Sequence, residues 1–411
     1  MLKSEPTYDF YCRTLTDSFL PFWEKAVDRT YGGVYTCFDN RGKEMLSQDK
    51  YTWSQGRFLW MWSRIVSLIE SGVLPVEMKA KVEQYRADAA LTAEFLSNHA
   101  FMDNGNVIFL LSREGEPKKA YEGEGLDASI YADCFVALGF AQFAITFKDA
   151  DYALKAEEVY RNITRRVDAG TFMTMPYPVP QGCSMHGLPM FSMYTGSDVA
   201  RALEANGFAD KASSVRAKAL DYAGPYNLEV KGPSSMDDTL LVRHMTPGHT
   251  MECLWFYLHL MDDARILDRM ALVDELGSYA FDHGWDEQYG GLFRFVDRAT
   301  GLEPQGRLVD DPYESLIRKT WDTKLWWVHS EALYFTALMA KRTGDDYWKK
   351  ANRKLFDYTF STFPNPDMEV GEWIQIRRRD GSPLDEVVAL PVKDPYHIVR
   401  NLLLLLELYH D

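Results

Sequence analysis

A repeated unit of two helices joined by a turn-rich segment constrains the fold of this chain more than any other feature. Helical periodicity predicts about twelve amphipathic segments, which fall into six consecutive pairs. The predicted helices span residues 8–27, 51–70, 78–99, 127–147, 150–167, 187–204, 208–222, 247–263, 265–282, 324–342, 345–361 and 395–409.

The segment between the two helices of each pair alternates like a strand and contains a turn. Each segment is expected to form a short β-hairpin, because a turn, usually with glycine, separates its two alternating stretches. Four of them resemble one another and two are less regular. The four begin at Gly32 (GGVYTCFDNRG), Asn106 (NVIFLLSREG), Gly290 (GGLFRFVDRATG) and Gly371 (GEWIQIRRRDG), and the two at Gly170 (GTFMTMPYPVPQG) and Asn227 (NLEV).

A unit that recurs six times forms either an open helical solenoid or a closed ring. The ends of a solenoid need a polar outer face, but the terminal helices here, LTDSFLPFWEKAV and IVRNLLLLLELY, are as apolar as the internal ones. We therefore predict an all-α fold, a single (α/α)6 barrel over residues 1–411. The second helix of each pair is then the inner one, and the short β-hairpins lie at the mouth, the end where the inner helices begin.

Composition excludes several functional classes. The net charge of −15 argues against a nucleic-acid or anionic membrane partner, because both reward clustered Lys and Arg. The N-terminus lacks the apolar region of a signal peptide, and no run approaches the roughly 18 apolar residues of a membrane span. A cytoplasmic protein is expected. The 5 cysteines are scattered without a C-x-x-C pair, so neither a disulfide framework nor a metal site is predicted.

Two helix starts carry an imidazole in the same local pattern. Pro247-Gly248-His249 is followed three residues later by Glu252, and Pro395-Tyr396-His397 is followed three residues later by Arg400. Proline suits the first helical position, and the positive end of the helix dipole lowers the pKa of a nearby imidazole, which favours a neutral general base. A lone histidine at a helix start is usually structural. Its duplication instead predicts two catalytic histidines, His249 and His397, that face one mouth.

Two predicted inner helices place charged side chains among aromatic ones. On the first, Trp53 and Arg57 share a face, and a guanidinium buried there requires an acidic partner or a ligand oxygen. A structural ion pair and a substrate clamp therefore both stay open for Arg57. On the fifth, Lys324, Trp327 and Glu331 follow at i, i+3 and i+7, which favours a cleft over a solvated surface. All five are candidates for substrate binding.

Two imidazoles around one cavity suit the removal of a proton from a carbon next to a carbonyl, with the resulting enediolate held by cationic donors. Return of the proton to the opposite face inverts the carbon, whereas return to the neighbouring carbon converts an aldose into a ketose. The residues allow either reaction. The sequence contains no dinucleotide fingerprint, Walker A loop, H-E-x-x-H or calcium loop, so no cofactor is implied.

Several of these segments, in this order, resemble the N-acylglucosamine 2-epimerases, also called renin-binding proteins, which are related to cellobiose 2-epimerases and aldose-ketose isomerases. The resemblance spans nearly the whole chain and is carried by DKYTWSQGRFLWMW, PGHTMECLW, HGWDEQYGGLF, KLWWVHSEAL and YHIVR. It implies an (α/α)6 barrel, a homodimer, and deprotonation and reprotonation of an open-chain sugar substrate.

The resemblance also implies roles for individual residues. It makes His249 and His397 the acid/base pair and surrounds the C1 to C3 oxygens of the sugar with Arg57, Glu252 and Glu331. Arg400 is implied as a further substrate-binding residue.

Two departures from the family bear on activation and substrate. Acylglucosamine epimerases are typically activated by ATP, and bacterial members have a glycine- and lysine-rich loop before the second histidine, whereas the loop at 390–395 is short and glycine-free. The resemblance thus allows ATP as an allosteric activator, whereas this loop argues against it. Cellobiose epimerases usually have a histidine on the third inner helix, where this chain has Met190-Phe191-Ser192-Met193-Tyr194.

This methionine-rich segment is closer to the acylglucosamine epimerases, so the resemblance implies interconversion of N-acylglucosamine and N-acylmannosamine. An aldose-ketose isomerase, or a 2-epimerase for mannose or cellobiose, is the nearest alternative. An inverting glycoside hydrolase would need two carboxylates about 6.5–9.5 Å apart. Glu252 and Glu331 are the candidates for that pair, but hydrolysis leaves both histidines without a role. A barrel that binds carbohydrate without catalysis is a further alternative.

Overall fold

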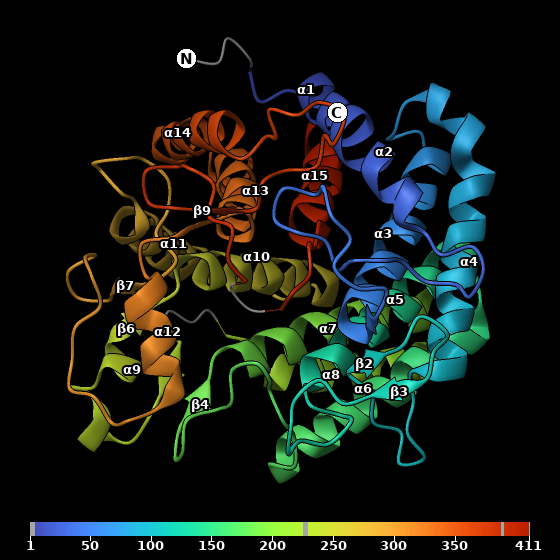
Figure 1. Ribbon diagram of the computed structural model, residues 1–411, viewed down its shortest axis with the longest axis horizontal. Helices are drawn as coiled ribbons and strands as arrows, with labels where there is room; N and C mark the ends of the chain where they lie inside the picture. Colours follow the sequence, from blue (N-terminus) through green and yellow to red (C-terminus); the bar gives the residue numbers. More distant parts are fainter. Residues whose placement is uncertain (1–4, 225–228, 388–389, 411) are drawn as a thin grey trace.

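Six long helices pack against one another in a closed cycle of contacts. The computed structural model describes residues 5–224, 229–387 and 390–410, and most of them are helical (Figure 1). Each of the six helices contacts the next one in the chain, and the last contacts the first. They are α3 (Thr52–Glu70), α5 (Ile130–Phe147), α7 (Gly187–Ala205), α10 (Pro247–Ala264), α13 (Trp326–Thr343) and α15 (Tyr396–Tyr409).

A second set of helices packs on these inner ones. Most outer helices are exposed along one face, whereas the inner helices are buried nearly all round, as expected for helices enclosed by neighbours. The first outer helix is interrupted by a π-helix at Thr14–Phe19. The outer helices are α1 (Tyr8–Arg13) with α2 (Leu20–Trp23), α4 (Val82–His99), α6 (Ala150–Ala169), α8 (Ala209–Asp221), α11 (Met270–Gly284) and α14 (Asp346–Thr362). All twelve predicted helices are thus present.

The strands are short and connect neighbouring units at the mouth. In three of the four sheets, a strand just before an inner helix pairs antiparallel with a strand of the next connecting segment. These pairs are β4 (Ser184–Met185) with β5 (Val230–Lys231), β6 (His244–Met245) with β7 (Val296–Asp297), and β8 (Lys324–Leu325) with β9 (Ile376–Arg377). The fourth sheet adds β1 (Lys50–Tyr51) to a hairpin of β2 (Leu110–Leu111) and β3 (Pro117–Lys118).

The expectation of one independent hairpin per segment is therefore only partly right. Local pairing occurs between β2 and β3 and at the bridges Phe38–Met45 and Arg377–Pro383. The segment at Gly170 instead bridges back to Ser129, which precedes α5. The expected start at Asn227 lies outside the described residues. Strands of two residues gain few local bonds, so partners from the neighbouring unit complete them.

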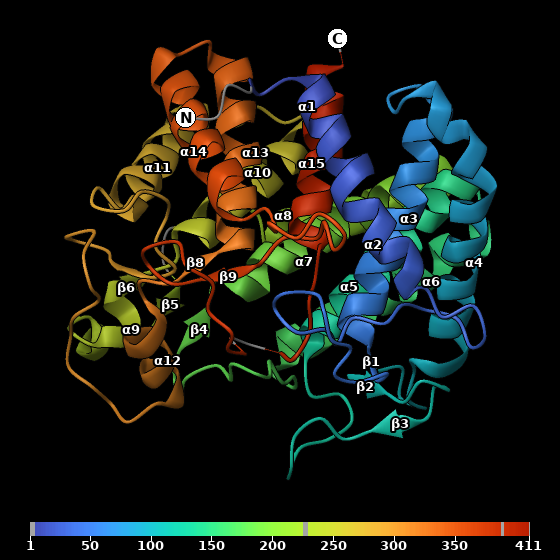
Figure 2. The same cartoon turned by 45° about the horizontal axis from the view of Figure 1, so that its top comes forward.

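Two short helices that the periodicity did not predict build a second hydrophobic cluster at the mouth. These are α9 (Leu240–Arg243) and α12 (Pro312–Thr320), which contact each other and lie beside β6 and β7 in Figure 1 and beside β6 in Figure 2. The cluster, here called the rim cluster, consists of Met185, Val230, Leu240, Leu241, Phe295, Tyr313 and Ile317. The main core extends from Tyr11 to Leu406 and includes four of the cysteines, all of which are free thiols.

Helix α5 is long and apolar enough to span a membrane by length and composition. Most of it is buried inside the protein, however, and a core helix passes the same test.

The two tightest neighbours in the cycle, α3 and α5, approach each other through glycines. A Cβ atom at Gly56 would lie 2.3 Å from the carbonyl oxygen of Phe135, and one at Gly139 would lie 2.6 Å from the carbonyl oxygen of Gly56. Backbone therefore lies against backbone here, which brings the first turns of both helices close together at the mouth.

Substitution Gly56→Ala is expected to lower the free energy of unfolding by about 1–3 kcal/mol, because the added methyl group overlaps the α5 backbone. Urea denaturation would measure the change. Ser67→Ala, at a half-buried position of the same helix, is the matched control and should have little effect. Equal stability of Gly56→Ala and the wild type would contradict this packing.

Candidate active site

A cavity of about 510 Å³ lies at the mouth of the helix cycle. All six inner helices contribute side chains from their first two turns, and the connecting segments supply the rest of the wall. The helix-borne residues include Trp53 and Arg57 of α3, Phe135 of α5, Met190 of α7, His249 and Glu252 of α10, Trp327 of α13 and His397 of α15.

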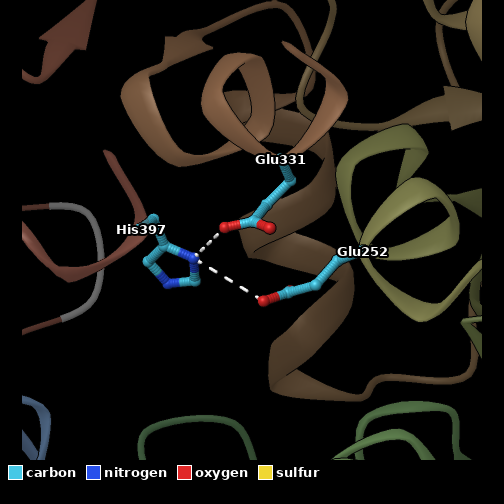
Figure 3. Close-up of side chains that lie close together, drawn as sticks. All are labelled: Glu252, Glu331 and His397. Carbon is cyan, nitrogen blue, oxygen red and sulfur yellow. Dashed lines mark hydrogen bonds and ion pairs between the residues drawn. The ribbon is translucent and has the colours of Figure 1, made fainter. Parts of the chain in front are cut away.

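His397 is held in one orientation by a carboxylate behind it. Its Nδ1 lies 2.7 Å from Oε1 of Glu331 and 3.7 Å from Oε1 of Glu252 (Figure 3). A carboxylate at this distance accepts the Nδ1 proton, which leaves the lone pair on Nε2. Burial lowers the pKa of His397 to about 3 and outweighs the raising effect of Glu252. The imidazole is therefore neutral at pH 7.

Arg400 lies beneath His397 and connects the two glutamates. Its Nη2 donates to Oε1 of Glu252 at 2.7 Å and to Oε1 of Glu331 at 2.6 Å, while Trp255 donates to the other oxygen of Glu331 at 2.9 Å. All four side chains are buried. Burial raises the pKa of Glu331 and Arg400 opposes that rise. With donors on both of its oxygens, Glu331 acts as a fixed acceptor for His397.

The same geometry bears on metal binding. Ligand atoms of Glu252, Glu331 and His397 lie within 4.8 Å of one another, as Figure 3 shows for their side chains. The carboxylate oxygens that a cation would use already accept hydrogen bonds from the guanidinium of Arg400. A cation here would meet that positive charge directly, so the group fits a hydrogen-bond network around an imidazole.

His249 has a different carboxylate partner. Its Nδ1 lies 2.9 and 3.0 Å from the two oxygens of Glu229, which is itself buried. Burial lowers the pKa of His249, but the charge and hydrogen bond of Glu229 and the charge of Glu252 together outweigh it, so the net pKa is raised. The expectation that both imidazoles have a lowered pKa is therefore wrong for His249, because nearby carboxylates together outweigh burial.

Trp327 lies close to both imidazoles. Its ring centroid is 4.8 Å from that of His249 and 5.8 Å from that of His397. Since α13 packs between α10 and α15, the tryptophan on its first turn lies near the two helix starts that carry the histidines. The cavity thus offers a neutral and a more basic imidazole beside an aromatic surface.

Arg57 is both ion-paired and part of the cavity wall. Its Nη1 donates to Asp394 at 2.6 Å, its guanidinium lies 3.9 Å above the ring of Phe135 and 4.7 Å from that of Trp53, and its Nη2 lies 3.4 Å from Nε2 of His397. The ion pair offsets the cost of burial. The remaining face of the guanidinium, next to His397, can donate to a substrate oxygen.

Three predicted substrate-binding residues do not line this cavity. Lys324 belongs to strand β8, where its Nζ donates to Asp286 at 3.1 Å. Its expected face shared with Trp327 is wrong, because the helix begins at Trp326 and helical spacing does not extend into the strand. Glu331 and Arg400 lie beneath His397 and act on the cavity through it.

Glu229, Asp394 and Arg294 are among the cavity residues that were not predicted from the sequence. Glu229 lies on the segment NLEV, and Asp394 directly precedes the second Pro-x-His pattern. Arg294 stands between two phenylalanines in GGLFRF, and a single charge in an apolar stretch is the signal that could have identified it. The partners of Glu229 and Asp394 are far away in sequence, so periodicity gave no sign of either pair.

Comparison with known proteins finds similar sequences and a similar fold. A family model described as N-acylglucosamine 2-epimerase (GlcNAc 2-epimerase) matches residues 224–401. N-acylglucosamine 2-epimerase from Bos taurus is 27% identical over 96% of this chain and 89% of its own length, and the Mus musculus enzyme is 28% identical over 94% and 88%. The solved structure of cellobiose 2-epimerase from Bacillus thermoamylovorans superposes with a TM-score of 0.74 at 18% identity, over 97% of this chain and 98% of that chain.

Substitution Arg400→Met is expected to lower the free energy of unfolding by about 3–5 kcal/mol, because it leaves two buried carboxylates without their cation. Chemical denaturation at pH 7 would measure the loss. Arg86→Met, which breaks the exposed pair with Glu70, is the control and should change stability little. A loss of the same small size in both variants would contradict the buried network.

Proposed function

We propose that this isomerase, which is similar over nearly its whole length to N-acylglucosamine 2-epimerases, interconverts N-acyl-D-glucosamine and N-acyl-D-mannosamine. The observation that carries this proposal is the pair of imidazoles near Trp327 whose pKa values are shifted in opposite directions. One can remove the proton at C2 of the open-chain sugar while the other returns a proton to the opposite face.

The cycle of helix contacts supports an (α/α)6 barrel, and in it we assign the following steps. Nε2 of neutral His397 takes the C2 proton, and the electron pair of the C–H bond passes to the C1 oxygen. Arg57, next to Nε2, donates to that oxygen as its charge develops. Protonated His249 then delivers a proton to the other face of C2. The reverse reaction uses the same residues with their roles exchanged.

The proposed substrate limits the chemistry to epimerisation. C2 of an N-acylated sugar carries nitrogen, so its deprotonation gives an enolate and a proton returned to C1 cannot yield a ketose. The step moves a proton and no net electrons, so it requires no redox cofactor. Relatives named N-acylglucosamine 2-epimerase that match over nearly the whole chain favour the acylated sugar over an unmodified one.

The geometry does not favour an inverting glycoside hydrolase. Oxygens of Glu252 and Glu331 both accept from one nitrogen of Arg400, at 2.7 and 2.6 Å. Two carboxylates that converge on one cation cannot stand on opposite sides of a glycosidic bond with a water between them.

In deuterated water, the wild type should convert N-acetylmannosamine into N-acetylglucosamine that carries deuterium at C2, which NMR would detect. His249→Asn and His397→Asn should each lower kcat by about 10²–10⁴, because each removes a proton-transfer group. His410→Asn, at an exposed position near the C-terminus, is the control and should be unaffected. Product formed without solvent deuterium would contradict the mechanism.

The pH dependence should report the carboxylate behind His249. Both directions of the reaction need one proton shared by the histidine pair, so activity falls when pH rises through the raised pKa of His249. Glu229→Gln removes the carboxylate that raises this pKa, and the alkaline fall of kcat/KM should therefore move to lower pH. Glu94→Gln, on the exposed face of α4, is the control. An unchanged alkaline limb in Glu229→Gln would exclude this role of Glu229.

A further inference from the structure

Arg294 is a buried cation in the cavity wall that the proposed proton transfers do not use. It lies on the segment between α11 and α13 and is 5% exposed. Its Nη1 donates to Thr320 at 3.1 Å and its Nη2 to the hydroxyl of Tyr177 at 3.3 Å. Among the residues that the structure describes, no carboxylate lies at ion-pair distance from Arg294, and its Nε has no hydrogen-bond partner.

This arrangement differs from that of the other cavity arginines. Arg57 is paired with Asp394, and Arg41 at the opening is paired with Asp385. A buried guanidinium without a carboxylate carries a large desolvation cost unless a ligand atom accepts from it. Arg294 is therefore built to meet an acceptor that enters the cavity.

The surroundings of Arg294 indicate the chemistry of that acceptor. The guanidinium lies 4.8 Å from the ring of Phe295, and the cavity wall beside it also includes Met185, Tyr177 and Tyr313. Three of these four side chains belong to the rim cluster and Tyr177 packs against it. One strong donor within an apolar and aromatic wall fits a carbonyl oxygen attached to a small alkyl group.

Arg294 also lies on the side of the cavity that contains His249, because strand β7, which follows it closely, pairs with β6 just before the helix that carries His249. Its positive charge lowers the pKa of His249, which acts against the larger raising effect of Glu229. A substituent on C2 of a sugar placed between the two histidines can therefore extend toward Arg294.

We infer that Arg294 and the four side chains Met185, Tyr177, Phe295 and Tyr313 form an acyl subsite. The guanidinium donates to the carbonyl oxygen of the N-acyl group, and the apolar side chains cover its alkyl part. This inference deepens the proposed function and rests on it for the identity of the sugar.

The charge at the opening of the cavity favours a neutral ligand over an anionic one. Three exposed carboxylates line the opening. Among the described residues there, Arg41 is the exposed cation, and it is paired with one of these carboxylates. An anionic sugar would pass this negative charge before it reached Arg294. The three carboxylates are those of Glu44, Asp385 and Glu386.

Binding of unreactive open-chain analogues tests the subsite without turnover. Isothermal titration calorimetry of the whole protein would compare N-acetylglucosaminitol with glucitol, which lacks the acyl group. The wild type should prefer N-acetylglucosaminitol, and Arg294→Met should reduce this preference by about 10- to 100-fold, the range expected for a hydrogen bond from a charged donor. Arg294→Lys should keep part of it, because the ammonium group can still donate. Arg41→Met, the matched cavity arginine, should leave the preference unchanged.

Several results would overturn the inference. These are an unchanged preference in a folded Arg294→Met variant, equal weakening of both alditols, or a selective loss of binding to gluconate, an open-chain anion of the same length. Epimerisation of N-acetylmannosamine by the wild type is measured in parallel. Absence of turnover contradicts the proposed function, whereas turnover with an Arg294-independent preference contradicts the acyl subsite alone.

Discussion

The buried guanidinium of Arg400 is the interaction on which the rest of the site depends. It joins α15 to α10 and α13 by donating to Glu252 and Glu331, and Glu331 in turn fixes Nδ1 of His397. Without this cation, two carboxylates would lie in an apolar interior at a cost of several kcal/mol. The same contacts that stabilise one side of the helix cycle therefore orient the proposed base, so stability and catalysis are coupled in these residues.

The two histidines occupy similar positions at the starts of their helices. Their pKa values nevertheless shift in opposite directions, because their carboxylate partners have different hydrogen-bond partners. Glu331 is shared by Arg400, Trp255 and His397, so little of its charge is available to stabilise an imidazolium. Both oxygens of Glu229 lie within hydrogen-bond distance of Nδ1 of His249. Burial raises the pKa of Glu229, but His249 and the other nearby imidazoles lower it to about 2. The local partner, and not the helix dipole alone, decides which imidazole carries the proton.

Helices could be predicted from the sequence because an apolar stripe repeats within each segment. The Pro-x-His pattern likewise lies within one short segment, so it identified both histidines. The strands could not be predicted, because most of these two-residue strands pair with a strand of the next unit. Lys324 was misplaced because a strand ends one residue before the helix on which its spacing was counted. Glu229 and Arg294 were missed because their contacts, with His249 in one case and Tyr177 in the other, join segments that no local pattern connects.

The proposed proton transfer and the proposed recognition of the acyl group are assigned to different parts of the molecule. Proton transfer is assigned to first turns of inner helices, which are packed on all sides and hold their side chains rigidly. Recognition of the acyl group is assigned mainly to connecting segments, where α9, α12 and the short strands add a second cluster. Trp327 belongs to the first group, and its ring lies close to both His249 and His397. In the proposed mechanism one imidazole removes the C2 proton and the other returns a proton, so the position of C2 relative to both determines epimerisation.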